Sequence, residues 1–165
     1  MRTELLIQDS EFILLSRIIS ASLKNKKISR MGTSIGSGFL ISIGSKIEVE
    51  NKIRDVYEWS IHVFNCKWRI YDPKKLIIKS WNNNSNIDNI ESDNIGKSIL
   101  NFRLEKNNLC IEMADGIIIS IDFDPAFISK NEVADNMEDA DILAIEYQKV
   151  WALNIQSNGK FVVDL

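Results

Sequence analysis

Hydrophobic residues recur at a helical period in one early stretch of the chain, residues 10–26. Phe12, Leu15, Ile19 and Leu23 follow one another at intervals of three or four residues, which predicts an amphipathic helix. Further apolar residues widen this stripe, so we expect the helix to be buried on more than one side. They are Ile13, Leu14 and Ile18. Capping and charged residues suit both ends: Asp9 or Ser10 with Glu11 at the start, and Lys24, Lys26 and Lys27 at the end.

After Gly32 the pattern changes to short apolar alternations separated by Gly, Asn, Asp and Pro. This texture is typical of antiparallel strands joined by tight turns. Turn residues predict one hairpin around Gly44 and Ser45, a second around Pro73 and a third around Gly159. The expected strands are 38–43, 46–49, 57–64, 67–71, 76–81, 149–155 and 160–163.

A three-strand meander between residues 100 and 123 shows the clearest alternation. Its first strand places Leu100, Phe102 and Leu104 on one face, and Asp115 followed by Gly116 is a strong hairpin signal. We expect this meander to form the centre of the sheet. Its other two strands carry the apolar sets Leu109, Ile111, Met113 and Ile117, Ile119, Ile121, Phe123.

Length and composition bound the architecture. The chain has 165 residues and is 45% hydrophobic, which suffices for one core. We therefore predict a single α+β domain, 1–165, in which an amino-terminal helix packs on a bent, mainly antiparallel β-sheet. Residues 82–94 lack periodicity and predict a long exposed loop, and 131–141 predict a loop or a short helix.

The chain carries no sign of secretion or of membrane insertion. Two isolated cysteines, Cys66 and Cys110, are too few for a disulfide framework. Glu4 and Asp9 interrupt the apolar amino terminus, unlike a signal peptide. The apolar stretch 12–23 is shorter than the roughly 20 residues that a membrane helix needs. We expect a cytoplasmic protein without membrane contact.

Charge is divided unevenly along the chain. Residues 1–80 hold fourteen basic and eight acidic residues, a net of +6, and residues 81–165 hold six and fifteen, a net of −9. Residues 131–141 contain five acids and no base. A solvated loop explains this acidic run as well as a docking surface does. As a docking surface, these acids would attract a basic partner. The expected partner-binding residues are Asp122, Asp124, Glu132, Asp135, Glu138, Asp139 and Asp141.

Few residue sets suit catalysis. His62 is the only histidine and Cys66 the nearest thiol, but a hydrogen-bonded strand histidine explains this spacing better than a nucleophile and base do. Asp122 and Asp124 could chelate a hard cation, although a solvated strand face gives the same pattern. We therefore predict no catalytic residue, metal or cofactor. Four tryptophans could stack on single-stranded nucleic acid, but core packing explains at least two of them better: Trp59, Trp68, Trp81 and Trp151.

Two stretches, 57–70 (YEWSIHVFNCKWRI) and 77–81 (IIKSW), resemble small bacterial proteins of unassigned activity. Members of that type are similar to immunity proteins of contact-dependent inhibition and other polymorphic toxin systems. The resemblance covers about Gly32 to Trp151. This sequence departs from the pattern of those proteins in its asparagine-rich loop and at Lys149, which precedes the final tryptophan strand. It implies a partner-binding role and supplies no catalytic residues.

Together these observations favour an immunity protein, not an enzyme. We expect it to bind and neutralise a cognate bacterial toxin, such as a basic nuclease domain, by stoichiometric occlusion. One alternative is a metal-assisted hydrolase that uses Asp122, Asp124 and His62. Another is a small-ligand-binding β module with a cupped apolar face.

Overall fold

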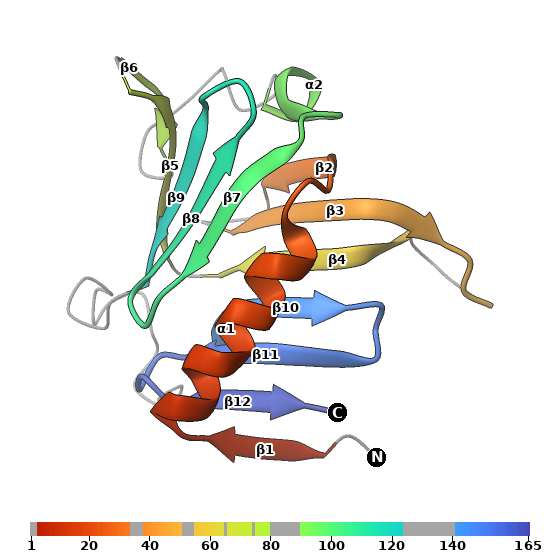
Figure 1. Ribbon diagram of the computed structural model, residues 1–165, viewed down its shortest axis with the longest axis vertical. Helices are drawn as coiled ribbons and strands as arrows, with labels where there is room; N and C mark the ends of the chain where they lie inside the picture. Colours follow the sequence, from red (N-terminus) through yellow and green to blue (C-terminus); the bar gives the residue numbers. More distant parts are fainter. Residues whose placement is uncertain are drawn as a thin grey trace.

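One long helix and two antiparallel sheets form the fold in this computed structural model, which describes residues 3–33, 38–50, 55–64, 66–73, 75–79, 90–123 and 141–165 (Figure 1). The long helix is α1, Asp9–Leu23, and a short helix is α2, Ile90–Asn94. The larger sheet contains, in spatial order, β1 (Glu4–Ile7), β12 (Phe161–Asp164), β11 (Trp151–Gln156), β10 (Asp141–Tyr147), β4 (Val56–Val63), β3 (Phe39–Ile47) and β2 (Ile28–Thr33). The smaller sheet contains β6 (Lys75–Lys79), β5 (Lys67–Asp72), β9 (Ile118–Asp122), β8 (Asn108–Met113) and β7 (Ile99–Leu104). The predicted α+β class, with an amino-terminal helix on a mainly antiparallel sheet, is confirmed.

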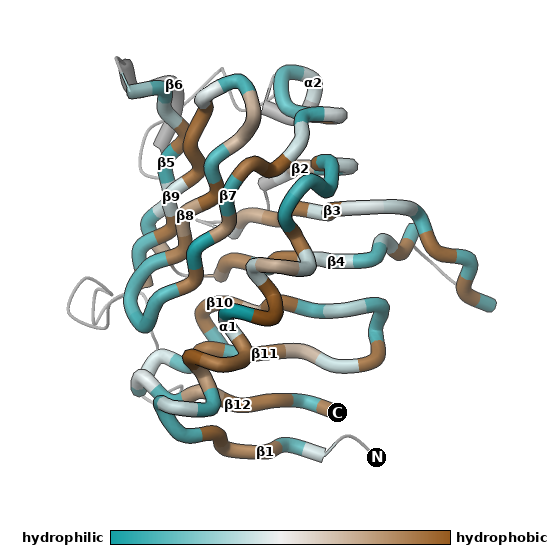
Figure 2. Tube along the Cα trace, in the orientation of Figure 1, coloured by the Kyte–Doolittle hydropathy of each residue, from teal (hydrophilic) through white to brown (hydrophobic). Residues whose placement is uncertain are grey.

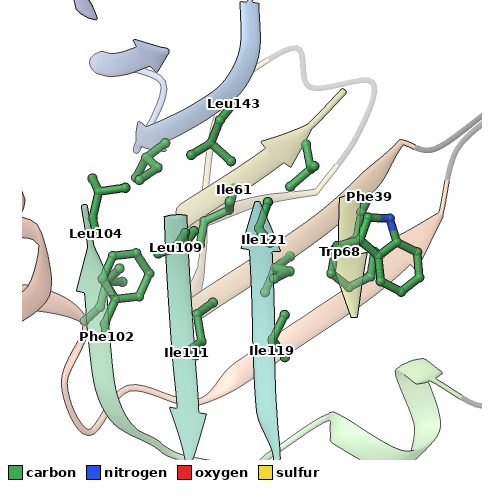
Figure 3. Close-up of a cluster of buried hydrophobic side chains, with 14 of the residues drawn as sticks. Phe39, Ile61, Trp68, Phe102, Leu104, Leu109, Ile111, Ile119, Ile121 and Leu143 are labelled. Atoms are coloured by element: carbon green, nitrogen blue, oxygen red, sulfur yellow. The ribbon is translucent and has the colours of Figure 1, made fainter. Parts of the chain in front are cut away.

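Helix α1 and the smaller sheet pack on the same face of the larger sheet. The rings of Phe12 on α1 and Phe161 on β12 stack with centroids 3.9 Å apart. Phe39 on β3 stacks in the same way on Trp68 of β5, at 4.4 Å. Side chains of the meander point into the space between the sheets (Figure 3). One buried cluster therefore contains residues of α1 and of both sheets.

The helix differs from the prediction at both ends and in its burial. Gln8 is the N-cap, and the Glu11 carboxylate accepts a 3.0 Å hydrogen bond from the Gln8 N–H. The helix ends at Leu23 instead of residue 26, because Asn25 takes a left-handed φ of 69° and turns the chain. Only one side is buried. Among the residues expected to widen the buried stripe, Ile13, Leu14 and Ile18 are 45%, 61% and 53% exposed.

Three predicted hairpins are confirmed, namely β5–β6, β8–β9 and β11–β12. The predicted hairpin at Gly44 is wrong, because residues 39–47 form one strand with a bulge between Ile43 and Lys46. A second bulge, between Ile99 and Asn101, buries Ile99 and leaves Leu100 45% exposed.

The sheet order also differs from the expectation. The prediction was a single sheet with the meander at its centre. In the structure there are two sheets, and the meander forms one side of the smaller one. Strands β1, β2 and β10 were not expected from the pattern, which placed the start of the sheet after Gly32. Residues 90–94 of the predicted loop form α2, and 82–89 lie outside the described residues, as do 131–140 of the predicted acidic loop.

The bulge in β3 is fixed by a carboxylate. Gly44 has a φ of 87°, and a Cβ built on it would lie 2.8 Å from Glu58 Oε1, so glycine is required by both conformation and space. Glu58 Oε1 accepts a 2.8 Å hydrogen bond from the Ser45 N–H, and Oε2 lies 2.9 Å from Lys26 Nζ. These contacts, first the Ser45 N–H and then Lys26, lower the pKa of Glu58.

The substitution Glu58→Gln should therefore cost stability in a pH-dependent way. A carboxyl with a lowered folded-state pKa stabilises the fold above its unfolded value of 4.5, and this contribution is lost as pH falls through the folded-state pKa. We expect a loss of about 1 kcal/mol at neutral pH and almost none well below about pH 4. Urea unfolding at both pH values measures it, with the exposed Glu50→Gln as control. An equal loss at both pH values would contradict the charge-based explanation.

Candidate functional site: an acidic cleft on one face of the larger sheet

Two of the seven predicted partner-binding acids lie in the described residues. Asp122 ends β9, where its Oδ1 accepts a 2.8 Å hydrogen bond from Asn108 Nδ2. Asp141 begins β10 in the other sheet. The structure therefore does not place these two acids on one strand or in one sheet. The other five, Asp124, Glu132, Asp135, Glu138 and Asp139, lie outside the described residues, so their grouping stays a prediction.

Asp141 interacts instead with acids from the two chain ends. The pKa of Asp141 is raised. The largest cause is partial desolvation of its carboxylate, and the next are the negative charges of Asp164 on β12 and Glu4 on β1. Glu4 and Asp164 are direct partners in the sheet. The strands at one side of the larger sheet thus concentrate negative charge, and sequence reasoning missed Glu4 and Asp164 because they are far apart in the chain.

His62 and Cys66 do not form a nucleophile and base pair. Cys66 is buried in the core, where its thiol donates to the Ile142 carbonyl at 3.2 Å. His62 lies on the opposite side of β4 from the buried Ile61 and stacks with Phe64, with ring centroids 6.4 Å apart. Within the described ranges, no group of three or more His, Cys, Asp or Glu could hold a metal ion.

The three tryptophans in the described residues pack in or beside the core, as expected for at least two of the four. Trp59 and Trp68 are 3% and 2% exposed. Trp151 meets Trp59 edge-on at 5.7 Å, and Trp81 lies outside the described residues.

The face of the larger sheet opposite α1 carries two rows of side chains, and we call it the outer face. Paired residues of an antiparallel sheet share a face, so the register assigns each row. One row is largely apolar: Leu6, Val162, Asn154, Ala144, His62 and Leu40. The other contains the acids: Glu4, Asp164, Ala152, Glu146, Ser60 and Ser42. α1 and the smaller sheet both pack on the other side of the larger sheet (Figure 1). On the outer face, Leu6 and Leu40 are exposed, whereas Val162, Asn154, Ala152 and Ser42 are only 5–8% exposed.

The outer face is apolar at its edges as well as acidic. Leu6 is 57% and Leu40 36% exposed, and Phe64, just after β4, is 43% exposed. Figure 2 shows the hydrophobic character of β1 and β12, the strands at one side of the sheet. Exposed apolar side chains beside charged ones are typical of protein interfaces.

A small cleft of about 110 Å³ opens at the acidic end of this face. Glu146 on β10 and Asp164 on β12 flank Ala152 on the strand between them, and the methyl group of Ala152 leaves room above it. Val150 and Leu165, which are 64% and 55% exposed, form an apolar rim. We call these five residues the acidic cleft.

One cation already lies in the acidic cleft. Lys149 Nζ is 2.7 Å from Glu146 Oε1, and the Glu146 side chain is only 16% exposed. Gln148 and Lys149, both with left-handed φ of 50° and 61°, form the turn that brings this lysine back over β10. Asp164 also lines the cleft, and Glu4 is the sheet partner of Asp164. The cleft is smaller than the roughly 300 Å³ of the smallest usual ligand pockets, and its size and charge suit the end of one Arg or Lys side chain.

Comparison with protein-family models, with curated proteins and with solved structures gives no match. No helix in the described part of the chain is long and apolar enough to cross a membrane.

Proposed function

We propose that the chain is an immunity protein that binds a cognate bacterial toxin domain on the outer face and occludes it. The observation that carries this proposal is the acidic cleft, in which two carboxylates flank an alanine within an apolar rim. An Arg or Lys of a basic partner can enter between Glu146 and Asp164 and displace Lys149. Such an anchor, surrounded by apolar contacts that exclude water, is typical of the residues that dominate protein interfaces.

The kind of toxin follows from the same charges. A nuclease domain has a basic surface that holds phosphates, and carboxylates can occupy that surface in place of nucleic acid. We propose that the complex forms in the cytoplasm, where such a toxin would act. Inhibition then needs no chemistry from this chain, only a stable complex of one copy with one toxin.

Co-expression tests the proposed class directly. If a large reading frame lies next to this gene, its carboxyl-terminal part is the toxin domain to use. We expect that domain alone to stop growth of a bacterial host, and co-expression of this chain to restore growth, with a complex of equal stoichiometry on size-exclusion chromatography. A toxic domain that this chain neither binds nor neutralises, or a gene without such a neighbour, would contradict the proposal.

A further inference from the structure

The larger sheet ends at β1, whose backbone points hydrogen-bonding groups out of the sheet. β1 is the outermost strand of the described larger sheet and pairs with β12 (Figure 1). The Thr3 N–H donates to the Leu165 carbonyl at 3.2 Å, and the Leu165 N–H donates to the Thr3 carbonyl at 2.9 Å. Because backbone groups alternate between the two sides of an antiparallel strand, those of Leu5 also face β12, whereas those of Glu4 and Leu6 face away. We call this outward side the β1 edge.

The side chains of β1 are exposed on both faces of the sheet. Leu6, on the outer face, is 57% exposed, and Leu5, on the face that carries α1, is 46% exposed. An exposed hydrophobic edge strand pairs readily with an extended segment of another chain. Edge lysines and prolines commonly prevent such pairing, and β1 contains neither. The β1 edge is therefore suited to accept a further strand with apolar side chains opposite the two leucines.

Charge decides which strand fits the β1 edge. β1 and β12 together contain two acids, Glu4 and Asp164, and no base. The two acids are sheet partners, so their side chains project from the same face, the outer one. A lysine or arginine opposite Glu4 in an added strand would project from that face too, beside both carboxylates. A second copy of this chain would instead bring its own two acids to the edge, which like-charge repulsion disfavours.

We propose that the β1 edge binds an extended segment of the partner as an added antiparallel strand, in which two apolar residues precede a basic one. The apolar residues lie opposite Leu6 and Leu5, and the basic residue lies opposite Glu4. The partner is the toxin domain, so this inference rests on the proposed function. Asp164 lines the acidic cleft and is the sheet partner of Glu4, so the added strand and the basic anchor bind next to each other.

Amide exchange measured by NMR on the full chain tests the strand pairing. The probe is the heptapeptide Ser-Thr-Val-Val-Lys-Thr-Ser, and the matched probe has glutamate in place of lysine. At a concentration about tenfold above its Kd, the lysine probe should slow exchange of the Glu4 and Leu6 amides about tenfold. The Leu5 amide already faces β12 and should change little. The proposal is overturned if the Glu4 and Leu6 amides do not slow, or if both probes slow them equally.

Leu6→Pro removes one outward N–H and leaves the bonds to β12 in place, and proline is tolerated at such edge positions. We expect Leu6→Pro and Glu4→Lys each to weaken binding of the lysine probe by about tenfold. Leu6→Ala keeps the N–H and is the matched control for the side chain. It should weaken binding less than Leu6→Pro does, and the exposed Asp93→Lys should leave binding unchanged. Equal losses for Leu6→Ala and Leu6→Pro would contradict backbone pairing.

The toxin domain separates this inference from the proposed function. We expect Leu6→Pro to weaken the complex with the toxin domain by about tenfold as well. If the complex forms and Leu6→Pro leaves its affinity unchanged, the strand inference fails and the proposed function stands. If no toxin domain binds, the proposed function fails, whereas slowed exchange of the Glu4 and Leu6 amides with the lysine probe would still assign a basic strand to the β1 edge.

Discussion

Replacement of Trp68 by alanine is expected to lower the free energy of unfolding by about 3–5 kcal/mol, the usual cost of truncating a fully buried aromatic side chain. Trp68 is 2% exposed and lies between the sheets, where its ring stacks on Phe39 of the larger sheet. Its loss removes apolar burial and leaves a cavity at the joint that holds β5 against β3. Urea unfolding followed by far-UV circular dichroism measures the change.

Phe64→Ala is the matched control. Phe64 is an aromatic residue close to Trp68 in the sequence, but it is 43% exposed on the outer face. Its truncation should cost no more than about 1 kcal/mol. If Trp68→Ala costs as little as Phe64→Ala, the two sheets are not joined by this stack and the described core is wrong.

The second large effect concerns binding of the toxin domain. Reversing both flanking charges of the acidic cleft, in Glu146→Lys with Asp164→Lys, should weaken the complex by about 2–4 kcal/mol, or roughly 30- to 1,000-fold in Kd. A basic anchor of the partner then meets two like charges where it had two opposite ones. Isothermal titration calorimetry at two salt concentrations measures the loss, and the salt dependence of affinity should become flatter.

Asp93→Lys provides the control for net charge. Asp93 is exposed on α2, a helix that contacts β2 and not the outer face. The substitution Asp93→Lys should change the free energy of toxin binding by less than about 1 kcal/mol. An equal loss from Asp93→Lys would mean that only total charge matters.

Reversal of Glu138, Asp139 and Asp141 tests separately the acidic stretch that the sequence predicts as a docking site.

The local elements of the fold were predictable because their signals are local. The turns at Pro73, Gly116 and Gly159 each combine turn-forming residues with alternation on both sides, and all three hairpins form. Gly44 misled the prediction, since the positive φ that suits a hairpin turn also suits a bulge inside one strand. At Ile99, a bulge changes which of two neighbouring apolar residues is buried, and alternation alone does not reveal that shift.

The candidate site was not predictable for a different reason. Glu4 and Asp164 become neighbours because β1 pairs with β12, the two ends of the chain. No short-range pattern reports such a pairing, and the four residues of β1 are too few to show an alternation. The charge asymmetry of the sequence drew attention to the acidic carboxyl-terminal half, where Glu146 and Asp164 lie, but gave no means of choosing those two residues.

Hydrogen–deuterium exchange on the chain, alone and bound to the toxin domain, tests the central claim most directly. The account predicts slower exchange on binding in β12 and in the turn between β10 and β11, which line the acidic cleft, and in β1, which pairs with β12. Exchange in β7, β8 and the exposed side of α1 should stay unchanged. Protection confined to α1 and β7, with the strands around the acidic cleft unaffected, would contradict the claim that the toxin binds the outer face.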